Sequence, residues 1–309
     1  MKRLFTRAVF LCAGLLLTIQ ILQGCATTSL VSTPSVQSYQ ITSDRGSEVD
    51  DGHDGRLRIM SLNIAHGRGD SFHQLLQQSA TTLANLNAIA VLLKDSGADV
   101  IALQEADGPS FWSGNFNHID YLAAIGSFSQ SVQGVHVDGL GLSYGTALIT
   151  RLDLRDPKVI TFDPALSPVP KGFVVSTVSW PGSPGVDVDI VSVHLDFASQ
   201  SVRKKQAMEL IETVRARKRP VIIMGDFNTG WQENSTVQYI SQELALSAYN
   251  PEGTGLETFP AFGERLDWIL VSAGISFRSY QVIPDTVSDH RGVVAELELD
   301  RIALFNPGD

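Results

Sequence analysis

Six short polar motifs follow or interrupt apolar, strand-like runs of this chain. They are Met60-Ser61-Leu62-Asn63, Ala102-Leu103-Gln104-Glu105, Val193-His194, Gly225-Asp226-Phe227-Asn228, Leu266-Asp267-Trp268 and Ser288-Asp289-His290. Their side chains are the parts of a hydrolytic metal site, because carboxylates bind hard cations such as Mg²⁺ and because imidazoles and carboxylates transfer protons. The motifs therefore predict a chemistry, whereas they say much less about a substrate.

Two of the motifs offer oxygen ligands at strand ends. Glu105 follows the apolar run 100–103 with only Gln104 between them, so we expect its carboxylate to project from a buried strand into a cleft. Mg²⁺ is usually held by one or two such carboxylates together with water and substrate phosphate. Asn63 follows the run 59–62, and its neutral amide can orient a metal ligand or bind a phosphoryl oxygen. Taken singly, Glu105 fits a surface position and Asn63 a turn.

The motif Gly225-Asp226-Phe227-Asn228 follows a short, wholly apolar run, 221–224, that is typical of a buried central strand. If the extended backbone continues, Asp226 and Asn228 point to the same side. The carboxylate can then orient a proton on water while the amide donates to a phosphoryl oxygen. The alternative is a turn, which Gly, Asp and Asn favour for local reasons.

Two histidines complete the set. His290 has Asp289 beside it, and an imidazole titrates near neutral pH, so it suits proton transfer or the stabilisation of charge at phosphorus. Asp267 is a candidate carboxylate partner that would fix the tautomer of a histidine. His194 lies near the end of the alternating run 186–195. Each histidine alone is more often a structural residue.

In this order the motifs resemble those of the endonuclease/exonuclease/phosphatase superfamily, which contains metal-dependent phosphohydrolases related to deoxyribonuclease I. The most specific are Gln104-Glu105, Gly225-Asp226-Phe227-Asn228 and Ser288-Asp289-His290. The segment Gly145-Thr146-Ala147-Leu148-Ile149-Thr150-Arg151 is similar to the family's central strand. The resemblance covers residues 57–299 and implies hydrolysis of a phosphoester, most simply a phosphodiester, by in-line attack of water.

The resemblance also implies a role for each residue of the motifs. In the metal site, Glu105 resembles the principal ligand of Mg²⁺ (or Mn²⁺), and Asn63 and Asp289 resemble residues that accompany it. In catalysis, Asp226 resembles the carboxylate that orients or deprotonates water, and Asn228 the amide that holds phosphate. His290 resembles the catalytic histidine, Asp267 its partner, and His194 the second histidine near the phosphate.

The elements expected around these motifs alternate between strands and helices. Apolar patterns predict strands at 57–64, 100–103, 144–150, 173–180, 186–195, 221–224, 266–271 and 293–299, and the run 173–180 alternates like a strand with one exposed face. Helical stripes predict helices at 81–96 and 201–217. The pattern favours two packed sheets with helices outside, an α/β fold. The resemblance implies the same arrangement, a four-layer α/β sandwich like that of deoxyribonuclease I.

The first residues are typical of a bacterial lipoprotein leader. Lys2, Arg3 and Arg7 precede an apolar stretch, 8–22, that is too short for a comfortable membrane span, and Leu22-Gln23-Gly24-Cys25 resembles a lipobox. We therefore expect a signal peptide at 1–24, a lipidated Cys25, a flexible tether at 25–55 and the catalytic domain at 56–309. This predicts a lipid-anchored protein of the cell envelope, facing the periplasm or on the outer membrane. An ordinary secretory signal or an uncleaved anchor is the alternative.

The cysteine content and the net charge disfavour some classes of site and substrate. The two cysteines, Cys12 and Cys25, both fall at the start, so a mature domain would contain no disulfide and no zinc–thiolate site. The formal charge of −10 becomes −13 once the three basic residues of the leader are removed, which disfavours nonspecific binding to nucleic acid. Candidate substrates are a lipid headgroup, a small phosphodiester or nucleic acid. A nuclease of the same fold and an inactive surface-binding lipoprotein remain the alternatives.

Overall fold

The computed structural model describes residues 35–40, 55–69, 79–163 and 169–300, with only the backbone of 35–40. The expected signal peptide and Cys25 lie outside these residues. Within them, no helix is long and apolar enough to cross a membrane. Residues 35–40, which belong to the expected tether, form strand β1 (Ser35–Gln40), paired antiparallel with β4. The expected tether is therefore not irregular throughout: this stretch covers an edge of β4 that would otherwise be unpaired.

The first of two mixed sheets contains seven strands, and in it only β2 and β3 run parallel to each other. Its order is β1, β4 (Gln130–Gly139), β5 (Leu142–Thr150), β3 (Val100–Asp107), β2 (Arg56–Asn63), β13 (Val293–Leu299) and β12 (Ile275–Val282). The second sheet contains six strands, and its parallel pair is β8 and β9. Its order is β10 (Leu246–Ala248), β11 (Asp267–Ser272), β9 (Val221–Asp226), β8 (Asp187–His194), β7 (Gly172–Ser179) and β6 (Arg155–Thr161).

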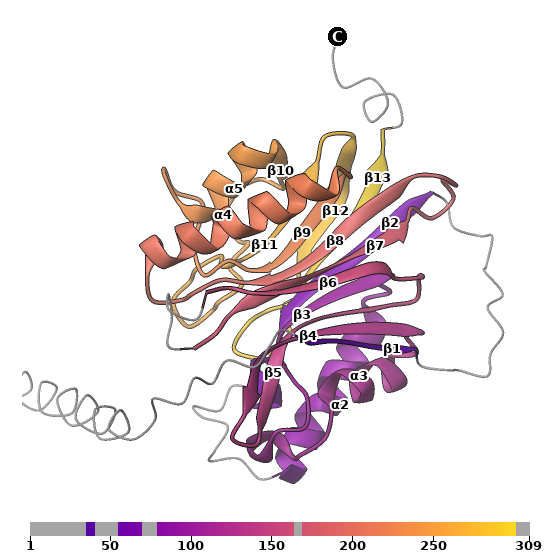
Figure 1. Cartoon of the computed structure of the whole chain (residues 1–309), viewed down its shortest axis with the longest axis vertical. Helices are drawn as coiled ribbons and strands as arrows, with labels where there is room; N and C mark the ends of the chain where they lie inside the picture. The colour runs from indigo at the N-terminus through magenta and orange to yellow at the C-terminus, as the bar shows by residue number, and fades with distance from the viewer. Residues whose placement is uncertain (1–34, 41–54, 70–78, 164–168, 301–309) are drawn as a thin grey trace, which may run out of the picture. The chain divides into compact units, whose positions relative to one another are not determined.

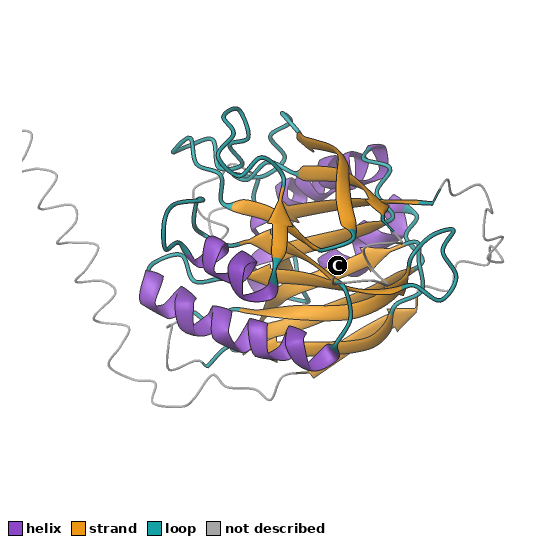
Figure 2. Ribbon diagram, turned by 90° about the horizontal axis from the view of Figure 1, so that it is seen from above, coloured by secondary structure: helices purple, strands orange, loops and turns teal. Residues whose placement is uncertain are grey.

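Helices cover the outer face of each sheet (Figures 1 and 2). Helices α2 (Ser79–Asp95) and α3 (His118–Gly126) share an apolar core with the first sheet, and α4 (Gln200–Arg217) and α5 (Thr236–Leu244) share one with the second. A third core fills the space between the sheets and includes Ile59 of β2 and Met224 of β9. Two packed mixed sheets flanked by helices confirm the predicted four-layer α/β sandwich.

The two parallel pairs bring the predicted motifs to matching positions. In the first sheet, Asn63 at the end of β2 pairs in register with Gln104, the residue before Glu105. In the second sheet, His194 at the end of β8 pairs with Asp226 at the end of β9, and Asp226 pairs with Asp267 at the start of the antiparallel β11. Carboxyl ends of parallel strands meet at one edge of a sheet, so each sheet presents chemistry at one edge.

The predicted strands and both predicted helices are present, each within a few residues of its expected bounds. One expectation about exposure is wrong: all of β7 except its last residue is buried, whereas its alternating pattern predicted one exposed face. The reason is that β7 is an inner strand, with one face on the core between the sheets and the other on the core under α4. Several elements were not predicted, namely α3, α5, β1, β4, β6, β10 and β12.

Candidate active site

Seven of the eight predicted site residues line one cavity of about 420 Å³. They are Asn63, Glu105, His194, Asp226, Asn228, Asp289 and His290. The eighth, Asp267, is fully buried behind His290. The structure therefore brings together residues that are separated by up to 227 positions in the sequence, which supports the prediction that they form one site.

Asp226 lines this cavity and contacts two other predicted site residues, Asn63 and His194. Its Oδ2 atom accepts a hydrogen bond from Asn63 Nδ2 at 3.1 Å and lies 3.5 Å from His194 Nε2. Burial raises the pKa of the Asp226 carboxyl, against the lowering effect of the nearby His290. A carboxyl group whose pKa is raised toward neutrality is well suited to accept a proton from water.

Asn228 reaches the same cavity by a different route from the one expected. Its backbone is left-handed, with φ of 51°, so the extended geometry does not continue past Asp226. Instead the Asn228 backbone N–H donates to Asp226 Oδ1 at 2.9 Å, a local turn. The side-chain Nδ2 donates to Leu195 O at 2.9 Å, which fixes the amide and leaves its second N–H for another acceptor.

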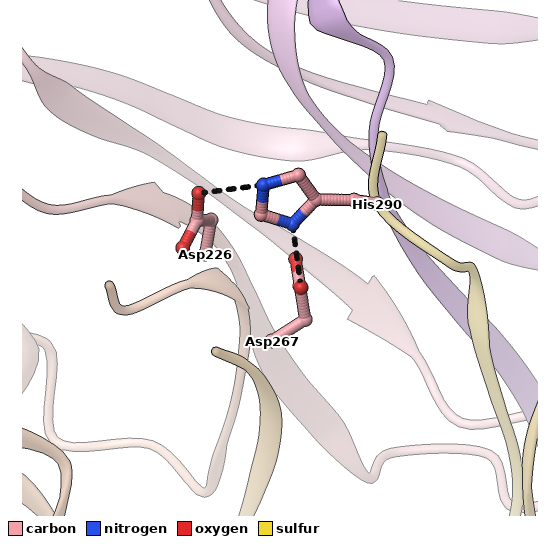
Figure 3. A group of neighbouring side chains, drawn as sticks. All are labelled: Asp226, Asp267 and His290. Carbon is pink, nitrogen blue, oxygen red and sulfur yellow. Dashed lines mark hydrogen bonds and ion pairs between the residues drawn. The ribbon is translucent and has the colours of Figure 1, made fainter. Parts of the chain in front are cut away.

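His290 is held between two carboxylates (Figure 3). Its Nδ1 donates to Asp267 Oδ2 at 2.8 Å, and its Nε2 lies 3.8 Å from Asp226 Oδ2. Burial alone would lower the pKa of His290, but Asp267 and Asp226 together raise it to about 10. The predicted pairing of Asp267 with His290 is thus present in the structure, and it makes His290 a cation at neutral pH.

Asp226, Asp267 and His290 also lie close enough to form a ligand group for a metal ion, with one ligand atom from each within 4.8 Å of the others. A histidine ligand must be unprotonated at the metal, so a cation bound here would displace the proton that the two carboxylates favour on His290. We interpret this group as a charged histidine with its two carboxylate partners, because the hydrogen bond from Nδ1 to Asp267 at 2.8 Å is already formed.

Glu105 owes its position to an irregularity in β3. The pairing of β3 with β5 shifts between Gln104 and Ala106, so Glu105 is the extra residue of a β-bulge, and its φ is 50°. Opposite the bulge stands Gly145, where a Cβ atom would clash with the carbonyl oxygen of Gly134, so only glycine fits there. The bulge turns the carboxylate into the cavity, where 22% of the side-chain surface remains exposed.

The neighbours of Glu105 are nitrogen groups. His66 Nε2 lies 3.4 Å from Glu105 Oε2, while Lys171 Nζ and His194 Nε2 lie 3.8 and 4.0 Å from Oε1. Burial would raise the pKa of Glu105, but His66 and Lys171 outweigh it and hold this pKa far below its usual range. Glu105 is therefore a permanent carboxylate, the ionisation state in which it can bind a cation.

His66 is a site residue that the sequence analysis missed. It lies in the short 3-10 turn η1 (Ala65–Gly67), with a left-handed φ of 56°. Its Nδ1 donates to Asp107 Oδ1 at 2.6 Å, and Trp112 Nε1 donates to the other oxygen of Asp107 at 2.8 Å. Burial lowers the pKa of His66, but the charges of Asp107 and Glu105 raise it by more, so the pKa lies above its ordinary value. The only available signal was a histidine shortly after a strand-end asparagine.

Lys171 is the second missed residue. It is buried at the start of the β7 region, and its Nζ donates to His194 Nε2 at 2.7 Å. Burial and the charge of Lys171 hold the pKa of His194 well below its ordinary value, so His194 is neutral and accepts this hydrogen bond. Burial also lowers the pKa of Lys171, against the charges of Glu105 and Asp226, which favour the ammonium form. No motif pointed to Lys171, because a single lysine before a strand usually lies at the surface.

Asp289 lines the cavity but has a partner of its own. Its Oδ2 atom accepts a charge-assisted hydrogen bond from Arg68 Nη2 at 2.5 Å. The ion pair draws one of its oxygens toward η1, at the rim of the cavity. Asp289 is therefore a less free oxygen donor than Glu105, whose neighbours lie at 3.4 Å or more.

The donor atoms around the cavity fit a hard divalent cation. Glu105 offers an ionised carboxylate, and Asn63 and Asp289 add an amide oxygen and a carboxylate oxygen at the same cavity. Carboxylate and carbonyl oxygens are the ligands that Mg²⁺ and Mn²⁺ prefer. No cysteine lies among the described residues, so thiolate ligands play no part there.

Comparison with solved structures shows the same fold in several proteins. An endonuclease/exonuclease/phosphatase from Bacteroides vulgatus matches with a TM-score of 0.63 and 19% identity, over 79% of this chain and 99% of that one. The corresponding protein from Beutenbergia cavernae matches with a TM-score of 0.62 and 20% identity, over 79% and 72%. D. rerio TDP2 complexed with a single-strand DNA product matches with a TM-score of 0.60 and 15% identity, over 79% and 100%. At these identities the likeness concerns the fold.

A search of curated proteins found no match. A model of the "Endonuclease/Exonuclease/phosphatase family", however, matches residues 60–290, a span that contains all eight predicted site residues. Members of this family are in general phosphoester hydrolases, and they typically use a divalent metal. The chain belongs to the endonuclease/exonuclease/phosphatase family.

Proposed function

We propose that the chain is a Mg²⁺-dependent phosphodiesterase that cleaves its substrate by in-line attack of water. One observation carries this proposal: Glu105, His194, Asp226 and His290, which come from two sheets and a late loop, line the same cavity. The family supports phosphoester hydrolysis in general. The preference for a diester and for Mg²⁺, with Mn²⁺ as a substitute, is our inference from the donor atoms.

Glu105 would hold the cation with Asn63, and Asp289 would assist from the rim. A bound divalent cation supplies a Lewis acid that offsets negative charge on the phosphoryl oxygens. Asn63 has a second task, because its amide donates to Asp226 and so fixes the carboxylate that faces water.

The remaining residues handle protons and charge. Asp226 orients the attacking water and takes its proton, which its raised pKa favours. The second N–H of Asn228 and the imidazolium of His290 donate to phosphoryl oxygens, with Asp267 holding the His290 ring in place. Neutral His194 accepts from Lys171 and thereby directs the ammonium group toward the same oxygens.

A panel of phosphoesters tests this function. Purified protein is incubated with bis-p-nitrophenyl phosphate, phospholipids, phosphoinositides and plasmid DNA, with Mg²⁺ and with chelator. We expect hydrolysis of at least one diester that chelator abolishes and that Glu105→Gln removes while the circular dichroism spectrum is unchanged. Hydrolysis that persists in chelator would contradict the proposal.

A nuclease is the second candidate. It is supported by one fold neighbour, D. rerio TDP2, which was solved with a single-strand DNA product. The acidic composition of this chain opposes it, because binding to nucleic acid depends on Lys and Arg contacts with phosphates. Cleavage of DNA or RNA in the panel, with rates that fall steeply as salt rises, would favour this candidate over a small-molecule or lipid diester.

We also propose that Cys25 is lipidated and anchors the domain in the cell envelope, facing the periplasm or on the outer membrane. The support is the sequence Leu22-Gln23-Gly24-Cys25 after a basic and apolar leader. Cys25→Ser should move the protein from the membrane fraction to the soluble fraction, and mass spectrometry should find a lipid on the wild-type cysteine. A wild-type protein without lipid would refute the anchor.

A further inference from the structure

A second, more enclosed cavity of about 160 Å³ adjoins the active-site cavity on the side of Glu105. The two cavities have four lining residues in common, and the walls of the second one also include Tyr144 and His136. The shared residues are Glu105, Lys171, His194 and Phe197. Asp226, Asn228 and His290 line only the first cavity. The shared residues therefore form a partition between a side that holds Asp226 and a side that holds Tyr144.

We propose that the second cavity binds the alcohol that leaves during hydrolysis, and that the Tyr144 hydroxyl donates to the leaving oxygen. This inference rests on the proposed phosphodiesterase function. In-line displacement places the attacking water and the leaving group on opposite sides of phosphorus. A phosphate bound at the shared residues would have the attacking water on the side of Asp226, and its leaving group would then depart toward Tyr144.

Tyr144 is held rigidly at this position. It lies in β5 opposite Asp107, next to Gly145, and its ring packs edge-on against His66 with centroids 4.9 Å apart. Trp112 packs on it at 5.5 Å. The Tyr144 hydroxyl has no hydrogen-bond partner in the part of the chain that the structure describes, so its proton is available to a bound group. Burial and the charges of Glu105 and Asp107 raise the pKa of Tyr144, which keeps the phenol protonated.

The charges around the second cavity select a neutral alcohol. Lys171 and Glu105 both line this cavity and lie 3.8 Å apart, so each offsets the other's charge, and neither a cationic leaving group such as choline nor an anionic one has an unopposed partner there. Burial and Lys171 lower the pKa of His136 to about 3, so this wall is uncharged. The small volume and aromatic walls suit a compact polyol, a sugar or glycerol hydroxyl whose C–H face packs on a ring.

In the proposed hydrolysis, each bond that forms is matched by one that breaks, and each proton has a donor and an acceptor. The water oxygen forms a bond to phosphorus and its proton passes to Asp226, while the bond from phosphorus to the leaving oxygen breaks. The leaving oxygen takes the Tyr144 proton, which solvent then restores, and Asp226 returns its proton to solvent. One proton is taken from water and one is delivered to the alcohol, with no oxidant, reductant or further reactant.

Four methyl phosphodiesters with different leaving alcohols test the inference: the p-nitrophenyl, glyceryl, thymidine 3′- and choline esters, assayed with Mg²⁺ and with product analysis by mass. A p-nitrophenolate ion leaves without a proton, so Tyr144→Phe should change its release less than about threefold. Release of glycerol or thymidine should fall about 100-fold, within the range for general acid catalysis. The glyceryl and thymidine arms also distinguish glycerol from a nucleoside sugar.

Tyr121→Phe is the matched control, because it removes a tyrosine hydroxyl that bonds to Asn87 on the exposed side of α3. It should leave all four rates unchanged. Equal losses of the p-nitrophenyl and alkyl reactions in Tyr144→Phe, or no loss in either, would overturn the role of Tyr144. Choline as the preferred leaving group would overturn the assignment of a neutral polyol.

A binding measurement separates this inference from the proposed function. Saturation-transfer NMR with free glycerol and free thymidine, in the presence of phosphate, should show transfer from the wild-type protein without any turnover. If no ester is hydrolysed but transfer is seen, the proposed function fails and the alcohol-binding cavity stands. If neither alcohol shows transfer, the cavity proposal is overturned, whatever the activity.

Discussion

Two histidines of the site are each held between an outer and an inner carboxylate, one on each side of the cavity. We call Asp267 and Asp226, with His290 between them, the second-sheet pair: His290 donates to Asp267 at 2.8 Å and lies 3.8 Å from Asp226. We call Asp107 and Glu105, with His66 between them, the first-sheet pair: His66 donates to Asp107 at 2.6 Å and lies 3.4 Å from Glu105. The two arrangements are alike in chemistry but end on carboxylates with different proposed tasks.

The outer carboxylates account for the difference between the pairs. Both oxygens of Asp107 accept hydrogen bonds, one from His66 and one from Trp112. The Oδ1 atom of Asp267 is buried with no partner among the described residues, so its charge acts mainly on His290. We infer that the second-sheet pair carries charge to the substrate, whereas the first-sheet pair fixes the position of Glu105.

The largest predicted effect is on the second-sheet pair. His290→Ala should lower kcat by roughly 10²- to 10⁴-fold, because it removes a cation and proton donor at the phosphoryl group. The rates are measured with saturating Mg²⁺ on protein whose circular dichroism matches that of the wild type. A loss of less than about tenfold would show that charge reaches the substrate from elsewhere.

The same pair should govern how stability depends on pH. Since the folded pKa of His290, about 10, is raised above the unfolded value of about 6.5, its contribution is fully present below pH 6.5 and is lost as pH rises through 10. The stability difference between the wild type and His290→Gln should therefore shrink across this window. Urea unfolding in chelator between pH 6 and 10 measures it, and a constant difference would contradict the assignment.

The first-sheet pair should affect metal binding more than turnover. His66→Ala should weaken divalent metal affinity roughly 10- to 100-fold, as loss of a partner of a metal ligand does. Isothermal titration with Mn²⁺ measures the affinity. At saturating metal, kcat for bis-p-nitrophenyl phosphate, whose leaving group takes no proton from Tyr144, should stay close to the wild-type value. An unchanged affinity with a large loss of kcat would make the two histidines equivalent and remove the distinction.

The smallest predicted effect comes from Trp112. Trp112→Phe keeps the ring contact with His66 but removes the N–H that donates to Asp107, so the free energy of unfolding should fall by about 1 kcal/mol. Thermal or urea unfolding measures the change. Metal affinity should decrease less than in His66→Ala, and a larger decrease would mean that Trp112 supports Glu105 directly.

The sequence predicted the second-sheet pair better than the first. Asp226, Asp267 and His290 stand at strand ends or in a motif, where residue type and spacing are informative. The position of Glu105 depends on a bulge, and that of His66 on a left-handed turn, and neither leaves a periodic pattern in the sequence. Lys171 was missed for the same reason: its role arises from packing against His194 in three dimensions.

The segment 108–114, which follows β3, is another place where packing in three dimensions decides what the sequence leaves open. Its aromatic residues fit either a packed loop or contact with a substrate. The structure divides them: Trp112 bonds to Asp107 inside the site, while the Phe111 side chain is 60% exposed. Short apolar runs predicted the strands well, and helical stripes predicted the two long helices. The nine-residue helices α3 and α5 were missed because they are too short for a clear helical period.

We propose that Glu105 and Asp226, which come from different sheets, serve one metal-dependent reaction. The most direct test measures hydrolysis of bis-p-nitrophenyl phosphate by the wild type, Glu105→Gln and Asp226→Asn across a Mg²⁺ titration. We predict that the wild type is active only with Mg²⁺, that Glu105→Gln shifts or abolishes the metal dependence, and that Asp226→Asn loses turnover at every Mg²⁺ concentration. Wild-type activity in chelator, or full activity in either variant, would show that these two residues do not serve a metal-dependent reaction.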